Sequence, residues 1–148
     1  YWLFGSVKSI SSDFFYFNKK HFIEFEDSGI IRLNYADNLV GVLNYSTAVW
    51  NKNFESSITI IGEKGTVKIG GQYMDQIKYC DIKDYSEPNI NSKVVCNDYG
   101  TYKGSASNHD KMIDNVVNVL IDKQEVHTNA LEGLSVVKII EEIYNQRK

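Results

Sequence analysis

Polar and aromatic side chains gather where the third expected strand runs into a loop. The run Tyr45-Ser46-Thr47-Ala48-Val49-Trp50-Asn51 combines hydroxyls, an indole and an amide. Strand ends that open into loops often carry ligand contacts, because a rigid scaffold there positions accessible side chains. We therefore predict a group of substrate contacts here: Tyr45, Ser46, Thr47 and Trp50. Ordinary aromatic packing at the end of a sheet is the alternative interpretation.

A second polar group precedes the first expected helix. Asn108 and His109 follow the loop 99–104 and offer amide and imidazole groups beside the positive end of the helix. Helix capping is the alternative, but capping needs only the hydroxyl of Ser107 and leaves the other two side chains unused. We therefore expect Asn108 and His109 to contact the substrate, without a role in the chemistry.

Neither the histidines nor the cysteines are spaced for catalysis or metal binding. His21, His109 and His127 lie far apart, without the close ligand spacing of zinc sites. Cys80 and Cys96 lack a paired CxxC spacing and are interpreted as small core residues. We therefore predict no metal site and no nucleophile.

Acid pairs and glycine pairs could supply other chemistry. Two carboxylates in different environments can act as general acid and base. Glu26-Asp27 stands before a strand and Glu141-Glu142 lies on the polar side of a helix, so solvated surfaces explain both pairs better. Gly70-Gly71 sits between strands, and no GxGxxG or phosphate-loop motif is present. The chain is therefore expected to contain no catalytic and no cofactor-binding residue.

Composition excludes several classes of partner. The 148 residues carry a net charge of -3, and their 16 basic side chains are scattered, which disfavours nucleic-acid binding. The longest apolar runs, such as 58–62 and 116–121, are far shorter than the roughly 20 residues that span a bilayer. Two cysteines are too few for a disulfide scaffold. We expect a cytoplasmic protein that binds neither nucleic acid nor membrane.

The first two thirds of the chain have the pattern of successive strands. Ile, Val, Phe, Tyr and Thr are frequent and are interrupted every eight to twelve residues by turn-forming residues. Residues that tolerate positive φ predict tight hairpins at Asp37-Asn38 and at Glu63-Lys64-Gly65. The predicted strands are 7–17, 28–35, 40–49, 56–62, 66–69 and 76–82, with a further short strand at 93–96.

The last third changes to helical spacing. Apolar residues recur at this spacing over 107–123, where Ser107 and Asp110 resemble a capping pair. A second helix is expected from Asn129, with Glu132 three residues later, to about Asn145. Strands followed by helices predict an α+β fold: an open, largely antiparallel sheet with the C-terminal helices on one face, in one domain over 1–148.

One predicted strand alternates in polarity. Ile31, Leu33 and Tyr35 would form an apolar face, whereas the opposite face, 30, 32 and 34, carries polar groups that can meet water or a partner. This alternation leaves open a stand-alone interaction domain that binds another protein through its sheet. An independent small enzyme that uses His109 and a nearby acid is a third hypothesis.

Two consecutive segments carry a family resemblance. Gly41-Val42-Leu43-Asn44-Tyr45-Ser46-Thr47-Ala48, followed by the strand pair at 58–67, resembles the C-terminal domain of the Gfo/Idh/MocA oxidoreductases, of the glucose-fructose oxidoreductase type. Upstream, Glu26-Asp27-Ser28 precedes a strand as in the family, and Tyr1 to Gly5 looks like the last turn of the preceding helix. Downstream, 107–109 and 128–134 open the two helices. The resemblance covers nearly the whole chain and is closest to the 3-dehydrogenase branch that oxidises UDP-linked N-acetyl amino sugar acids.

The resemblance implies a two-domain enzyme of which this chain is the second part. An N-terminal Rossmann domain would hold NAD or NADP, and the C-terminal sheet would wall the substrate site and mediate homo-oligomerisation. The family's catalytic lysine, in a Glu-Lys-Pro-like motif, has no match here. Hydride transfer between a sugar hydroxyl carbon and the nicotinamide would therefore belong to the parent enzyme. By position, Tyr45 to Trp50 would face the sugar or nucleotide-sugar, and Asn108 and His109 would approach it from the helix.

Overall fold

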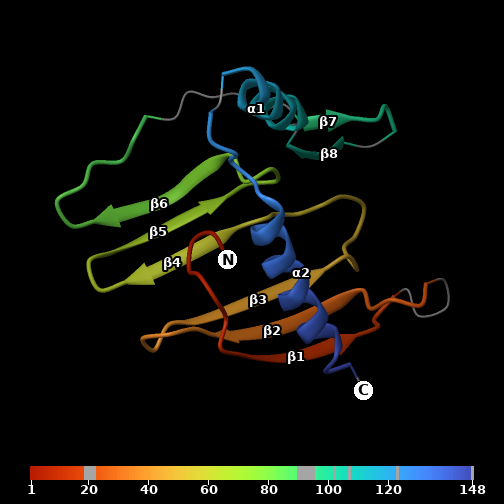
Figure 1. Cartoon of the computed structure of the whole chain (residues 1–148). Helices are drawn as coiled ribbons and strands as arrows, with labels where there is room; N and C mark the ends of the chain where they lie inside the picture. The colour runs from red at the N-terminus through yellow and green to blue at the C-terminus, as the bar shows by residue number, and fades with distance from the viewer. Residues whose placement is uncertain (19–22, 90–95, 102, 107, 123, 148) are drawn as a thin grey trace. The chain divides into compact units, whose positions relative to one another are not determined.

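The elements follow the predicted order of strands before helices (Figure 1). The computed structural model describes residues 1–18, 23–89, 96–101, 103–106, 108–122 and 124–147. The strands are β1 (Ser9–Phe15), β2 (Ser28–Asn34), β3 (Val40–Ser46), β4 (Ile58–Gly62), β5 (Gly65–Gly70), β6 (Gln76–Ile82), β7 (Cys96–Asp98) and β8 (Lys103–Ala106). The helices are α1 (His109–Asp122) and α2 (Ala130–Tyr144). The α+β class is confirmed.

The chain divides into two compact units. Tyr1–Trp50 with Glu125–Lys148 form the first unit, which contains the sheet β1-β2-β3 and the helix α2. Asn51–Gln124 form the second unit, with the sheet β4-β5-β6, the β7-β8 pair and α1. Every strand pair within the described residues is antiparallel, as predicted. Hydrogen bonding divides these strands into three sheets, and a single domain over 1–148 stays a prediction.

The predicted turn between β2 and β3 is confirmed. Asp37 and Asn38 have φ angles of 54° and 60°, in the left-handed region that these two residue types tolerate. Two backbone hydrogen bonds close the turn: the amide of Tyr35 donates to the carbonyl of Leu39 at 2.9 Å, and the amide of Leu39 donates to the carbonyl of Ala36 at 3.1 Å. It fixes a register in which Gly29 of β2 lies opposite Tyr45 of β3.

The helix α2 covers one face of the first sheet (Figure 1). Ile10 of β1 and Ile31 of β2 are the buried apolar residues of this face. The hydroxyl of Ser12 donates to the carbonyl of Ile143 at 3.0 Å, and the side-chain amide of Gln146 donates to the carbonyl of Ile10 at 2.8 Å. The C-terminal turn of α2 is therefore anchored to β1 by polar contacts as well as by apolar packing.

The start of α2 also agrees with the sequence. The side-chain oxygen of Asn129 accepts a hydrogen bond from the amide of Glu132 at 2.9 Å, which is the expected N-cap. Near the other end of the first unit, Gly5 has a φ of 72° and its amide donates to the carbonyl of Tyr1 at 2.7 Å. The predicted glycine-terminated turn at 1–5 is thus present.

The region before α1 differs from the expectation of a loop at 99–104. The strands β7 and β8 form an antiparallel pair there. Gly100 lies in the connection between them with a φ of 77°, and its amide donates a hydrogen bond to the Asp98 carboxylate at 2.9 Å. Most of the strand predicted at 93–96 and the capping residue Ser107 lie outside the described residues. Within the parts of the chain that the structure describes, no helix is long and apolar enough to cross a membrane.

Candidate functional site

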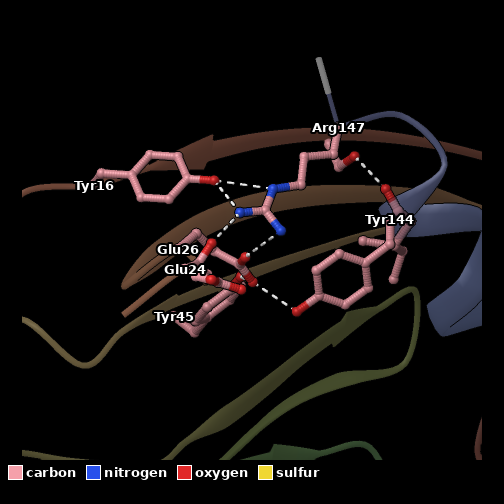
Figure 2. A network of polar contacts seen from close by, with 8 residues as sticks. Tyr16, Glu24, Glu26, Tyr45, Tyr144 and Arg147 are labelled. Carbon is pink, nitrogen blue, oxygen red and sulfur yellow. Dashed lines mark hydrogen bonds and ion pairs between the residues drawn. The ribbon is translucent and has the colours of Figure 1, made fainter. Parts of the chain in front are cut away.

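A carboxylate just before β2 connects the end of β3 with the end of α2 (Figure 2). Oε1 of Glu26 accepts hydrogen bonds from the hydroxyls of Tyr45 and Tyr144, each at 2.7 Å. The residue is only 8% exposed, and its neighbour Asp27 is fully buried. The interpretation of this acid pair as a solvated surface is therefore wrong, because the two side chains are enclosed by tertiary contacts. The exposed pair Glu141-Glu142 agrees with its prediction.

Arg147 balances the charge of this buried carboxylate. Its Nη1 lies 4.0 Å from Oε2 of Glu26, an atom that is buried and accepts no hydrogen bond from any described residue. The guanidinium is itself held in place: Nε and Nη2 donate to the hydroxyl of Tyr16, and Nη2 donates to the carbonyl of Glu24 at 2.7 Å. It also lies 5.6 Å from the centre of the Tyr16 ring, within reach of a cation–π interaction.

The pKa shifts show which protons this network carries. Burial alone would raise the pKa of Glu26, but the hydrogen bonds from Tyr144 and Tyr45 and the charge of Arg147 outweigh it, so the pKa lies below its ordinary 4.5. Burial and the Glu26 carboxylate raise the pKa of the Tyr45 phenol. The hydrogen bond to Glu26 and burial raise the pKa of Tyr144. At neutral pH the acid is ionised and both phenols are protonated, so the network is a fixed clamp and not a proton shuttle.

The neighbouring Asp27 holds the residues that follow β3. Its carbonyl accepts the amide of Thr47 at 2.7 Å and the Thr47 hydroxyl at 3.3 Å. Its carboxylate accepts the hydroxyl of Ser28 at 2.9 Å and the amide of Asn18 at 2.8 Å. The hydroxyls of Ser28 and Ser46 lie 2.8 Å apart. Glu26 and Asp27 together therefore set the backbone path at the end of β3.

The first predicted contact group, Tyr45 to Trp50, divides into anchored and exposed residues. The hydroxyls of Tyr45, Ser46 and Thr47 are all engaged in the hydrogen bonds just described. Trp50, in contrast, is 94% exposed, so its ring can stack against a ligand. Whether these four residues contact a substrate stays a prediction.

The second predicted contact group lies in the second unit. Asn108 and His109 are both exposed at the start of α1. The carbonyl of Asn108 accepts the amide of Met112 at 3.3 Å, so this residue precedes the first turn of the helix and presents its side chain to solvent. Their role as substrate contacts also stays a prediction.

Sequence reasoning weighed Glu26 only as part of a solvated acid pair and a family-like segment, and it did not single out Tyr144 or Arg147. A local signal for part of this network was present, because a glycine inside a strand often marks a close approach of another group. A Cβ on Gly29 would lie 2.6 Å from Cε1 of Tyr45, so the glycine lets the phenol ring lie across β2. The contribution of Tyr144 had no such signal, because it lies 118 residues from Glu26.

The described parts of the chain contain no residues arranged to bind a dinucleotide or a metal ion. Gly70 ends β5 and is followed by a turn into β6, so the glycine pair does not form the strand-to-helix turn that binds a dinucleotide. No group of three or more His, Cys, Asp or Glu side chains in these parts could hold a metal ion.

The second unit contains an apolar pocket of about 400 Å³ on the β5-β6 sheet. Val67, Ile69, Cys80 and Ile82 line it from the strands, and Tyr85 and Pro88 line it from the following loop. Cys80 is a half-buried free thiol among these apolar side chains. Its surroundings are apolar, as predicted, but it lines a pocket and is not fully buried, so its interpretation as a core residue stays a prediction.

Antiparallel strands followed by helices define an α+β domain, and the described residues lack the glycine-rich turn of a dinucleotide-binding domain. The chain belongs to the Gfo/Idh/MocA family: the family model described as "Oxidoreductase family, C-terminal alpha/beta domain" matches residues 1–148. The family expected from the sequence is therefore confirmed.

Two solved structures are similar over nearly the whole chain. The WlbA dehydrogenase from Bordetella pertussis, in complex with NADH and UDP-GlcNAcA, is 30% identical with a TM-score of 0.75; 98% of this chain and 37% of that chain are covered. The WlbA dehydrogenase from Chromobacterium violaceum, with the same two ligands, is 28% identical with a TM-score of 0.73; the coverage is 98% and 39%. The chain thus spans less than two fifths of either relative. Among curated proteins, no sequence matches it.

Proposed function

We propose that this chain is the substrate-binding and oligomerisation domain of an NAD(P)-dependent oxidoreductase that acts on the hydroxyl of a nucleotide sugar. The similarity to WlbA dehydrogenases bound to NADH and UDP-GlcNAcA carries this proposal. The cofactor and the catalytic groups would then belong to an N-terminal Rossmann domain of a longer protein, since less than two fifths of either relative is covered. A cytoplasmic location, where free NAD(P) is available, is part of the same proposal.

The residues of the first unit suit a binding role. Three hydroxyl-bearing residues at the end of β3, Tyr45, Ser46 and Thr47, are held by hydrogen bonds to 26–28, which gives the segment a defined shape. Trp50 follows with an exposed aromatic face that can stack on a nucleotide base or a sugar ring. Such a surface would orient a substrate. Orientation contributes to rate because it fixes the reacting groups before the reaction.

Reduction of NAD⁺ or NADP⁺ by the full-length protein tests the proposal. Each cofactor is mixed with UDP-GlcNAcA, and the absorbance of the reduced nicotinamide is followed. The matched control is UDP-GlcNAc, which shares the nucleotide and lacks the sugar carboxylate. We expect turnover with the sugar acid and a much lower rate with the control. Absence of turnover with every UDP-linked sugar acid and with both cofactors would contradict the proposed activity.

The outward face of the first sheet favours self-association or a protein partner. Ile30, Val40 and Val42 lie on the face opposite α2 and are 48%, 52% and 68% exposed. Val40 and Val42 are neighbours on β3, and each of the three apolar residues lies opposite a polar residue of the adjoining strand. Exposed apolar side chains gathered on one face are typical of protein interfaces. A homo-oligomer formed through this face belongs to the enzyme proposal, whereas a stand-alone interaction domain is the second candidate function. Val42→Asp should lower the oligomeric state measured by light scattering; an unchanged mass would count against self-association through this face.

A further inference from the structure

We infer that Glu26 is a positioning residue for the substrate-binding segment 46–50. The inference rests on the proposed function, because it assigns a role within the same site. Glu26 precedes β2 and does not belong to the segment itself. It acts by fixing Tyr45, the first of the proposed substrate contacts, and so determines the direction in which residues 46–50 leave β3.

One oxygen atom holds two distant elements. Oε1 of Glu26 receives the phenol of Tyr45 from β3 and the phenol of Tyr144 from α2, both at 2.7 Å (Figure 2). Bonds to an ionised acceptor are shorter and stronger than neutral ones, and two donors on one atom restrict its position further. The helix α2 is also anchored to β1 through Ser12 and Gln146. Glu26 is therefore hydrogen-bonded to a helix that is itself held on the sheet.

The geometry of Arg147 supports a positioning role over simple stabilisation. A buried carboxylate is costly to desolvate, and apolar residues of similar size often stabilise a fold as well or better. Here the charge is kept, although the nearest nitrogen of Arg147 stands 4.0 Å from Oε2 and makes no hydrogen bond to that atom. Both hydrogen bonds to the carboxylate meet Oε1, so the geometry of Glu26 fixes the phenols of Tyr45 and Tyr144 to one point and does not form a close ion pair.

The backbone beyond Tyr45 depends on the same segment. Asp27 follows Glu26 directly, and its carbonyl binds both the amide and the hydroxyl of Thr47. The amide of Ala48 is in turn bound by the hydroxyl of Ser46 at 3.1 Å. A shift of Glu26 would therefore move the anchor of Thr47 together with Tyr45. Trp50 lies three residues beyond this anchor, so its place on the substrate surface depends on it.

The test compares three variants of the full-length protein: Glu26→Ala, Glu26→Gln and Asn129→Ala. Glutamine keeps an oxygen that can accept the two phenols, so it should partly rescue the alanine variant. Asn129→Ala removes the N-cap of α2 without touching the carboxylate network and serves as a control for general destabilisation. The readouts are KM and kcat for the nucleotide sugar, and amide hydrogen exchange of 46–50 compared with β2.

We expect Glu26→Ala to raise KM about tenfold or more, with a smaller change in kcat, and to increase exchange in 46–50 about tenfold while β2 is unchanged. Asn129→Ala should leave KM and the exchange of 46–50 unchanged. Unaltered exchange of 46–50 in Glu26→Ala, or an equal KM effect in Asn129→Ala, would overturn the positioning role. A wild-type protein without turnover would contradict only the proposed function, because hydrogen exchange still tests the positioning of the segment.

Discussion

Gly29 and Tyr45 face each other across the β2-β3 ladder, and the phenol ring lies where a side chain at position 29 would be. A Cβ built on Gly29 would stand 2.6, 2.8 and 2.9 Å from Cε1, Cζ and the hydroxyl oxygen of Tyr45. The glycine therefore gives the ring room to reach Oε1 of Glu26. Gly29 and the ring of Tyr45 therefore depend on each other.

Gly29→Ala should therefore destabilise the protein by about 1–3 kcal/mol, because the added methyl group displaces the Tyr45 ring and its hydrogen bond to Glu26. Urea unfolding measures the change. Gly41→Ala is the matched control in β3, since a Cβ there would meet the Tyr35 ring at an ordinary 3.5 Å. Equal effects of the two substitutions would show that the Gly29–Tyr45 contact has no special weight.

The lowered pKa of Glu26 makes its contribution to stability dependent on pH. The folded-state pKa lies below the ordinary 4.5, so the stabilisation is fully present above that value and is lost as the pH falls through the folded pKa. We expect Glu26→Gln to cost about 1–3 kcal/mol at neutral pH, because the phenols lose a charged acceptor. The difference from wild type should shrink below the ordinary pKa of the acid.

Urea unfolding at a series of pH values measures this difference. Glu142→Gln is the control, since Glu142 is exposed on α2, outside the network. A wild-type advantage over Glu26→Gln that stays constant from neutral to acidic pH would mean that the charge on Glu26 does not hold the two phenols.

Trp50→Ala should separate binding from stability. With 94% of the residue exposed, its loss should change the free energy of unfolding by less than about 0.5 kcal/mol. If the indole stacks on the nucleotide, the apparent affinity should fall about tenfold, since a stacked base contributes about 1–3 kcal/mol. Trp2→Ala, at a residue 87% exposed in the same unit, controls for the loss of a surface indole. An unchanged KM for Trp50→Ala would remove this residue from the binding surface.

His109→Ala tests the second predicted contact. The imidazole is exposed at the first residue of α1, so its removal should change stability little. As a substrate contact, its loss should raise KM by a few-fold and leave kcat nearly unchanged, because no catalytic role is assigned to it. Lys111→Ala, two residues further along the same helix and also exposed, is the control. If His109→Ala binds the nucleotide sugar as tightly as wild type, His109 is not a substrate contact.

Local patterns in the sequence determined the class of fold and several of its boundaries. The alternation in β2, the left-handed turn at Asp37-Asn38 and the N-cap of Asn129 each depend on residues within a few positions of one another. The family resemblance also came from short consecutive segments, and the match over 1–148 confirms it. Backbone preferences and side-chain periodicity act over such short ranges, so a single sequence is enough to reveal them.

Only the tertiary structure decided whether the Glu26-Asp27 pair is buried or solvated. The sequence favoured a solvated pair, because charged side chains are rarely buried without partners. The partners of Glu26 lie 19 and 118 residues away, at Tyr45 and Tyr144, and local pattern does not reveal which phenols a carboxylate will meet. Burial and hydrogen bonding are properties of elements that pack together. The carboxylate before β2 therefore acts as a clamp only because α2 packs on the sheet and brings Tyr144 to it.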